Sequence, residues 1–82
     1  SDKVRVFWIA HPRCEISDCR SWSAHPHHIR TRGAGGDDES VNLMGLCTMH
    51  HTQIHQIGSE TFGNMYPEVE LKIKGALERS RV

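Results

Sequence analysis

Histidine and cysteine, the residues that most readily bind metal ions, are concentrated in one stretch of this chain. Residues 25–55 contain six of the seven histidines and one of the three cysteines, and Cys14 and Cys19 lie just upstream. Imidazole nitrogen and thiolate sulfur are the ligands that Zn²⁺ and similar ions prefer. We therefore interpret the stretch as two adjacent metal sites, one closed and structural and the other open and catalytic.

The spacing of the later ligands separates them into two groups. In a helix over residues 47–57, which turns about 100° per residue, His50 would lie about 60° to one side of Cys47. His51 and His55 would lie about 40° and 80° to the other side. Cys47 therefore groups with His50, and His51 groups with His55. The opposite partition would spread His50 and His55 over about 140°, too wide an arc for one small ion.

The first group is completed by the upstream cysteines. Cys-x4-Cys followed by Cys-x2-His supplies four ligands for a closed tetrahedral Zn²⁺ site: Cys14, Cys19, Cys47 and His50. One such site uses all three cysteines, whereas disulfides would leave one thiol over, so we expect structural zinc and a reducing, cytoplasmic compartment. Zinc would also stabilise a chain of 82 residues, whose apolar core alone is marginal. Buried free cysteines beside an exposed histidine are the alternative.

The second group, His51 and His55, lies at positions i and i+4 and needs a ligand from elsewhere, for which His27 is the best candidate. Three histidines leave coordination positions open for a phosphate oxygen. Adjacent residues of a strand point to opposite sides, so His28 would stand apart from the ion. Its imidazole could accept a proton from water near neutral pH, provided that the backbone bends enough to bring both histidines to one cleft. Surface histidines without a joint role are the alternative.

The elements that must position these residues begin with a helix, predicted over residues 3–10. Its inward side chains are expected to be apolar ones: Phe7, Val6, and either Ile9 or Ala10. Aromatic side chains are also expected in the core: Phe7, Trp8 and Trp22. Two strands, over residues 20–24 and 27–30, are expected to follow and to pair with each other.

The rest of the chain is expected to be a loop followed by helices. Residues 33–40, with three glycines before Asp-Asp-Glu-Ser, predict a flexible linker, and residues 41–46 return to the core. The helix over residues 47–57 should end at Gly58. A short helical turn begins at Ser59. The last helix covers residues 67–79, with Pro67 in its first turn and an apolar stripe of Val69, Ile73 and Leu77.

The charges are unevenly distributed along a chain whose formal net charge is zero. Residues 1–36 carry six basic and three acidic residues, residues 37–70 carry six acidic and no basic ones, and residues 71–82 carry four basic and one acidic. An anionic partner such as DNA would have to contact the basic ends, helped by the field of a bound ion. Solvated faces without a target explain the charges equally well.

The motifs resemble those of a known family. His27-His28-Ile29, Asn42-Leu43 and His51-Thr-Gln-Ile-His55 are similar to the three motifs of the HNH endonucleases, the ββα-metal nucleases. The four zinc ligands resemble the zinc knuckle found in many members, especially those of phages and prophages. The resemblance covers residues 14–55 and implies a small α+β domain over residues 1–82, in which a ββα-metal core motif at 14–57 and its zinc knuckle are flanked by helices.

The resemblance also implies a role for each motif residue. His28 would be the general base, and His27, His51 and His55 would bind the catalytic ion. Asn42 would brace the loop between strand and helix and help to orient the histidine base. Many members have Asp in place of His27, and some have Asn in the last motif. The all-histidine form is similar to the colicin-type branch, and imidazole ligands suit Zn, Ni, Co or Mn better than Mg.

The function implied is metal-dependent hydrolysis of DNA phosphodiester bonds by a phage or bacterial intracellular enzyme. His25, Arg30 and Arg32 are the basic residues nearest the motifs and are candidate phosphate contacts, although a structural histidine and solvated arginines are the alternatives. A zinc-stapled module that binds DNA or protein without catalysis is the alternative function, and a purely structural two-zinc domain is a third. No apolar run is long enough to cross a membrane, and no signal peptide is visible.

Overall fold

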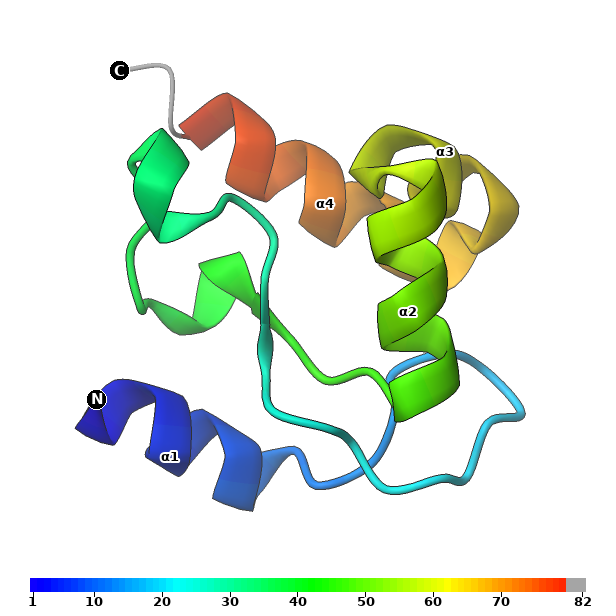
Figure 1. Ribbon diagram of the computed structural model, residues 1–82, viewed down its shortest axis with the longest axis horizontal. Helices are drawn as coiled ribbons and strands as arrows, with labels where there is room; N and C mark the ends of the chain where they lie inside the picture. Colours follow the sequence, from blue (N-terminus) through cyan, green and yellow to red (C-terminus); the bar gives the residue numbers. More distant parts are fainter. Residues whose placement is uncertain (80–82) are drawn as a thin grey trace.

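Four helices and a two-stranded antiparallel sheet make up residues 1–79, the part of the chain that the computed structural model describes (Figure 1). The elements follow in the order α1 (Asp2–Ala10), β1 (His27–His28), two 3₁₀ turns, η1 (Arg32–Ala34) and η2 (Ser40–Asn42), β2 (Leu43–Met44), α2 (Thr48–Ile57), α3 (Ser59–Met65) and α4 (Pro67–Arg79). The predicted α+β class is therefore confirmed. None of these helices has the length and apolar character needed to span a membrane.

The strand pairing differs from the one predicted. Residues 27–28 pair with residues 43–44, in the register His27 opposite Met44 and His28 opposite Leu43. The predicted strand over 20–24 does not form, and Trp22 makes only an isolated bridge with Arg13. Leu43 and Met44 are completely buried, so pairing with them places β1 against the core. The backbone of the segment 20–24 bonds elsewhere: the N–H of Ser23 donates to the carbonyl of Pro12, and the N–H of Ala24 donates to that of Leu46.

Helix α1 forms where the sequence predicted it, but it buries a different face. Val4 and Phe7 are its buried residues, and they pack on Leu43. Val6 and Ile9 are exposed, as is Ala10, so of the predicted inward residues only Phe7 is correct. Val4 and Phe7 are three residues apart, as are Val6 and Ile9, so each pair lies on one helical face. The contact with Leu43 determines that the first pair is the buried one.

The two tryptophans are not core residues. Trp22 is 65% exposed, and the guanidinium of Arg13 lies 3.7 Å from the centre of its ring. Trp8 is also exposed and lies edge-on against His25. An indole can cover a polar neighbour from the surface while one face stays in water, and these two do so.

Helices α2, α3 and α4 pack in succession and supply five buried residues of the larger core cluster: Ile54, Phe62, Val69, Ile73 and Ala76 (Figure 1). Cys47 is the N-cap of α2, and Gly58, with a φ of 86°, ends it as predicted. Phe62 of α3 is completely buried. The predicted stripe of α4 is confirmed for Val69 and Ile73, and Leu77 packs at the edge of the core.

The predicted linker over residues 33–40 is anchored by charged side chains. Asp37 pairs with Arg79, Asp38 with Arg32 and Glu39 with Lys3, so acids from this loop meet basic residues from α1, η1 and α4. The loop also passes very close to the end of β1: a Cβ at Gly36 would lie 1.8 Å from the carbonyl oxygen of Arg30. Glycine is therefore required at this position, and the segment makes defined contacts with α1, η1 and α4.

A matched pair of leucines tests the central position of β2. Leu43 is 0% exposed and Leu71, on α4, is 82% exposed. Leu43→Ala is expected to lower the free energy of unfolding by about 2–5 kcal/mol, because it leaves a cavity between β2 and α1. Leu71→Ala should change it by no more than about 0.5 kcal/mol. Urea titration of both variants in the presence of zinc measures the difference, and similar losses in the two would contradict this description of the core.

Candidate metal centres

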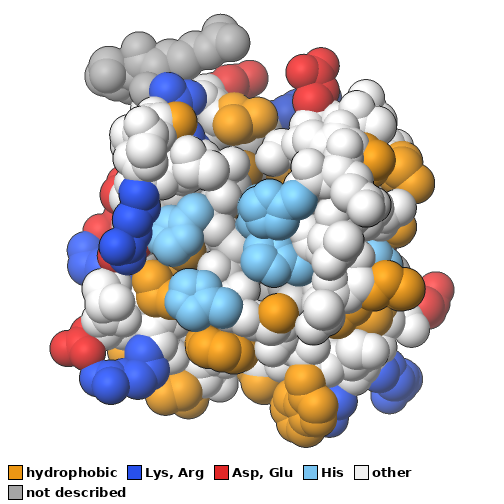
Figure 2. Space-filling model, in the orientation of Figure 1, with side chains coloured by type: hydrophobic (Ala, Val, Ile, Leu, Met, Phe, Trp, Pro, Cys, Tyr) orange, Lys and Arg blue, Asp and Glu red, His pale blue; other side chains and the backbone are white. Residues whose placement is uncertain are grey.

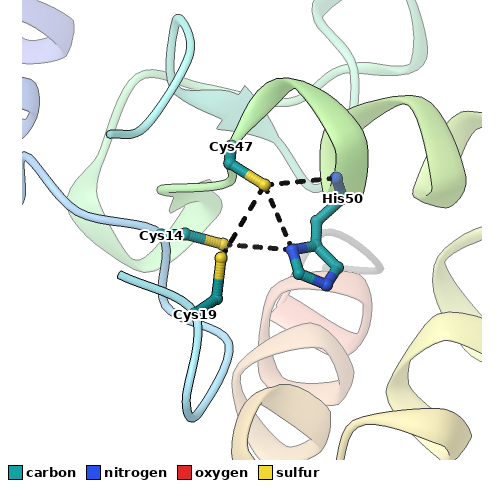
Figure 3. A group of neighbouring side chains, drawn as sticks. All are labelled: Cys14, Cys19, Cys47 and His50. Atoms are coloured by element: carbon teal, nitrogen blue, oxygen red, sulfur yellow. Dashed lines mark hydrogen bonds between the residues drawn. The ribbon is translucent and has the colours of Figure 1, made fainter. Parts of the chain in front are cut away.

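The first candidate centre joins the loop after α1 to the start of α2. Four side chains meet there, with ligand atoms within 4.8 Å of one another: Cys14, Cys19, Cys47 and His50 (Figure 3). The sulfurs of Cys19 and Cys47 are 3.9 Å apart. His50 Nδ1 lies 3.2 Å from the sulfur of Cys47 and 3.5 Å from that of Cys14. Zn–S bonds of about 2.3 Å at tetrahedral angles place two sulfurs about 3.8 Å apart, so the cluster has the dimensions of a zinc site.

Burial distinguishes the thiols of this Cys3His cluster. Cys14, Cys47 and His50 are buried, and Cys19 is partly exposed. Burial raises the pKa of the Cys14 thiol to about 11, whereas a backbone N–H hydrogen bond from Ser21 lowers the pKa of Cys19. A bound cation would replace the proton on Cys14 and compensate the charge of the buried thiolates. The cluster can therefore hold a structural metal ion such as zinc.

Backbone hydrogen bonds and one carboxylate hold the cysteine loop in place. The N–H of Cys14 donates to the carbonyl of Ser21, and the N–H of Cys19 donates to that of Ile16. The carboxylate of Glu15 accepts hydrogen bonds from the N–H of Gly45 and from Lys72 of α4. The loop is thus attached to the segment before α2 and to α4, so its cysteines reach the ligands of α2.

The second candidate centre lies between β1 and α2. His27 of β1 and His51 and His55 of α2 have ligand nitrogens within 4.8 Å of one another. The ring centre of His27 is 5.2 Å from each of the other two, and the Nε2 atoms of His51 and His55 are 3.1 Å apart. The two groups separated on the helical wheel are therefore the two groups that the fold brings together.

The imidazole of His27 has the environment of a cation ligand. Its side chain is 7% exposed, and within residues 1–79 its Nε2 has no hydrogen-bond partner. Burial, together with the neighbouring imidazoles of His51 and His55, lowers the pKa of His27 to about 4. The ring is therefore neutral at pH 7, and its buried nitrogen lies beside two other imidazoles. A divalent ion fits this group, because it would satisfy an otherwise unpaired buried nitrogen.

His28 and Asn42 have separate environments next to this centre. The Nε2 of His28 lies 2.8 Å from a carboxylate oxygen of Asp38, and His28 is near enough to His27 to help lower its pKa. Asn42 is 1% exposed and makes three side-chain hydrogen bonds to the backbone of two residues. It accepts from the N–H of Arg30 and donates to its carbonyl, and it also donates to the carbonyl of Asp37. Asn42 therefore closes the loop between β1 and η2.

Asp38 is the residue that sequence reasoning missed. In the sequence, the Asp-Asp-Glu run belongs to the predicted linker, and acidic residues after glycines give no reason to select one of them. The only usable signal was the surplus of acids in that segment, which required basic partners elsewhere. Which acid meets which partner depends on the path of the loop.

The three candidate phosphate contacts are differently engaged. His25 is exposed. The pKa of His51 is lowered mainly by burial, then by the neighbouring His55 and least by His25. Arg30 donates to the carbonyl of Ala34, and Arg32 makes a bidentate pair with Asp38. Figure 2 shows histidine side chains gathered on one face of the molecule, with Lys or Arg side chains at their edge. Both arginines would exchange a partner within the protein for a phosphate.

Comparison with models of known protein families, with curated proteins and with solved structures found no match.

Proposed function

We propose that this domain is a metal-dependent endonuclease of the HNH type, of phage or bacterial origin, that hydrolyses phosphodiester bonds in DNA. One observation carries the proposal: the three imidazoles of a partly exposed group converge, with His28 the next residue to one of them in β1, while a separate and mostly buried Cys3His cluster forms its own site. A closed site suits a structural ion, and an open site of three nitrogen ligands leaves coordination positions for substrate. A nuclease whose fold is stabilised by zinc needs one closed structural site and one open catalytic site.

The residues take distinct roles in this proposal. His27, His51 and His55 would hold the catalytic Zn, Mn, Ni, Co or Mg ion, which when bound stabilises negative charge on the phosphoryl group and the departing 3′ oxygen. His28 would accept the proton of the attacking water. Asn42 would keep the loop after β1 in place, which its three backbone hydrogen bonds support.

The acidic loop is compatible with a DNA partner. Its acids pair with basic side chains of the same molecule, so they present less uncompensated negative charge to phosphate than the sequence alone suggests. His25, Arg30 and Arg32 remain the proposed phosphate contacts. Their arrangement beside the histidines would place the scissile strand over the open centre.

The alternative is a zinc-stapled module that binds DNA or protein without catalysis. The observation in its favour is that the charge of Arg32 is already compensated by Asp38, which leaves the open centre with less basic charge for a phosphate. The plasmid-nicking experiment described next distinguishes the two functions.

Plasmid nicking by the full chain tests the proposal. After mild chelation that removes the ion from the three-histidine centre and leaves the Cys3His zinc in place, we expect no nicking. Adding back Zn, Mn, Ni, Co or Mg should restore it for at least one ion. Binding of that ion should weaken in His51→Ala and stay unchanged in His11→Ala, because the ring of His11 contacts Phe7 instead.

Other results would point elsewhere. DNA binding without nicking in the presence of any of these ions would identify the non-catalytic module. Two ions that both resist mild chelation, with no nicking under any condition, would identify a structural two-zinc domain.

A further inference from the structure

The carboxylate of Asp38 meets the ring nitrogen of His28 from across a ten-residue loop. Asp38 Oδ1 lies 2.8 Å from His28 Nε2, and both side chains are partly buried, with 20% and 16% of their surfaces exposed. An ionised carboxylate can only accept a hydrogen bond. His28 Nε2 must therefore carry the proton, and in the neutral ring the lone pair is then on Nδ1.

Asp38 is itself held by several donors. Arg32 donates to both of its oxygens, at 2.8 and 2.9 Å, and the hydroxyl of Ser1 donates at 2.7 Å. The hydrogen bonds from Ser1, His28 and Arg32 hold the pKa of Asp38 well below its usual range, so it is ionised at neutral pH. Its backbone is fixed from the other side, because Asn42 donates to the carbonyl of the preceding residue, Asp37, at 2.8 Å.

The other nitrogen of His28 is not engaged in the same way. Within residues 1–79, the hydrogen bond of the His28 ring is the one at Nε2 to Asp38. The residue before it, His27, belongs to the three-histidine centre, so β1 places the two imidazoles next to each other in the chain. The carboxylate thus takes one nitrogen of His28 and leaves the other as the acceptor.

We propose that Asp38 is a positioning residue for the nuclease reaction: its carboxylate fixes the ring of His28 with the proton on Nε2, so that Nδ1 accepts the proton of the attacking water. This inference rests on the proposed function. It also explains how Asn42 would help to orient His28. Asn42 holds the backbone of residue 37 and thereby places the carboxylate of residue 38. In catalytic triads, too, a third group orients the base.

Kinetics of three variants test the inference. With the catalytic ion at saturation, Asp38→Ala should lower kcat about 10- to 100-fold with little change in KM, as losses of outer-shell partners do. Asp38→Asn keeps an acceptor oxygen of the same size and should lose less than Asp38→Ala. Glu78→Ala is the control: it removes an exposed carboxylate of α4 that lies outside the loop carrying Asp38, so kcat should be unchanged.

A double variant separates positioning from a structural effect. If Asp38 acts through His28, adding Asp38→Ala to His28→Ala should cause no further loss of residual cleavage. A further loss of the same size as in the single variant would overturn the inference. So would an Asp38→Ala variant that folds and keeps its kcat.

Nuclear magnetic resonance of the zinc-loaded chain tests the contact without any assay of cleavage. The ring N–H of His28 should be observed on Nε2, protected from exchange, and this protection should disappear in Asp38→Ala. A proton found on Nδ1 would overturn the inference even in an active enzyme. Wild-type protein that shows no metal-dependent cleavage would instead refute the proposed function, whichever nitrogen carries the proton.

Discussion

Removing zinc from the Cys3His cluster is expected to unfold the domain. A structural zinc site contributes an apparent binding free energy of about 10–16 kcal/mol. A chain of 82 residues has a total stability of only about 4–12 kcal/mol. The cluster joins the cysteine loop to α2, and without an ion its buried thiols have only weak hydrogen bonds to satisfy them. Circular dichroism melting curves before and after strong chelation, under reducing conditions, measure the effect.

The same experiment contains its controls. Restoring zinc should restore the cooperative transition, and zinc affinity should rise with pH, because the ion must displace the proton that burial holds on Cys14. Mild chelation that empties only the three-histidine centre should change the melting temperature much less, because that centre is partly exposed. A cooperative transition that persists after metal analysis shows no zinc would contradict the structural role of the cluster.

His28→Ala is expected to abolish most of the proposed nuclease activity while leaving the fold and both ions in place. General-base catalysis by a positioned side chain contributes about 10²- to 10⁴-fold to a rate, so cleavage should fall by that factor. His28 lies outside both groups of metal ligands. Single-turnover cleavage of a plasmid at saturating metal measures the change, with metal content and melting temperature measured on the same sample.

The matched control for this variant is His11→Ala. His11 is exposed, and its ring contacts Phe7 rather than the histidines of either centre, so cleavage should stay at the wild-type rate. Unchanged cleavage in His28→Ala would refute the assignment of the base. Loss of cleavage accompanied by loss of a metal ion would indicate that His28 acts through metal binding instead.

Local spacing was enough to predict the grouping of the metal ligands. Cys47, His50, His51 and His55 lie within one helix or at its start, and an α-helix fixes the angle between side chains whatever surrounds it. The bounds of α2 and α4 followed for the same reason, since Gly58 and Pro67 determine a helix end and a helix start through their own backbone preferences. A short stretch of sequence is therefore enough to determine the grouping of these ligands and the ends of these helices.

Other features were decided only by contacts between distant segments. The pairing of residues 27–28 with 43–44, the burial of Val4 instead of Val6, and the exposure of both tryptophans depend on which apolar surfaces meet, as Leu43 shows. The hydrogen bond from His28 to Asp38 depends on the path of a loop that is closed by Asn42 and anchored by ion pairs to α1 and α4. The sequence by itself therefore determined which residues could bind metal and how they group on the helix. The tertiary structure decided which strand and which carboxylate lie beside them, because residues far apart in the chain meet only once the core is packed.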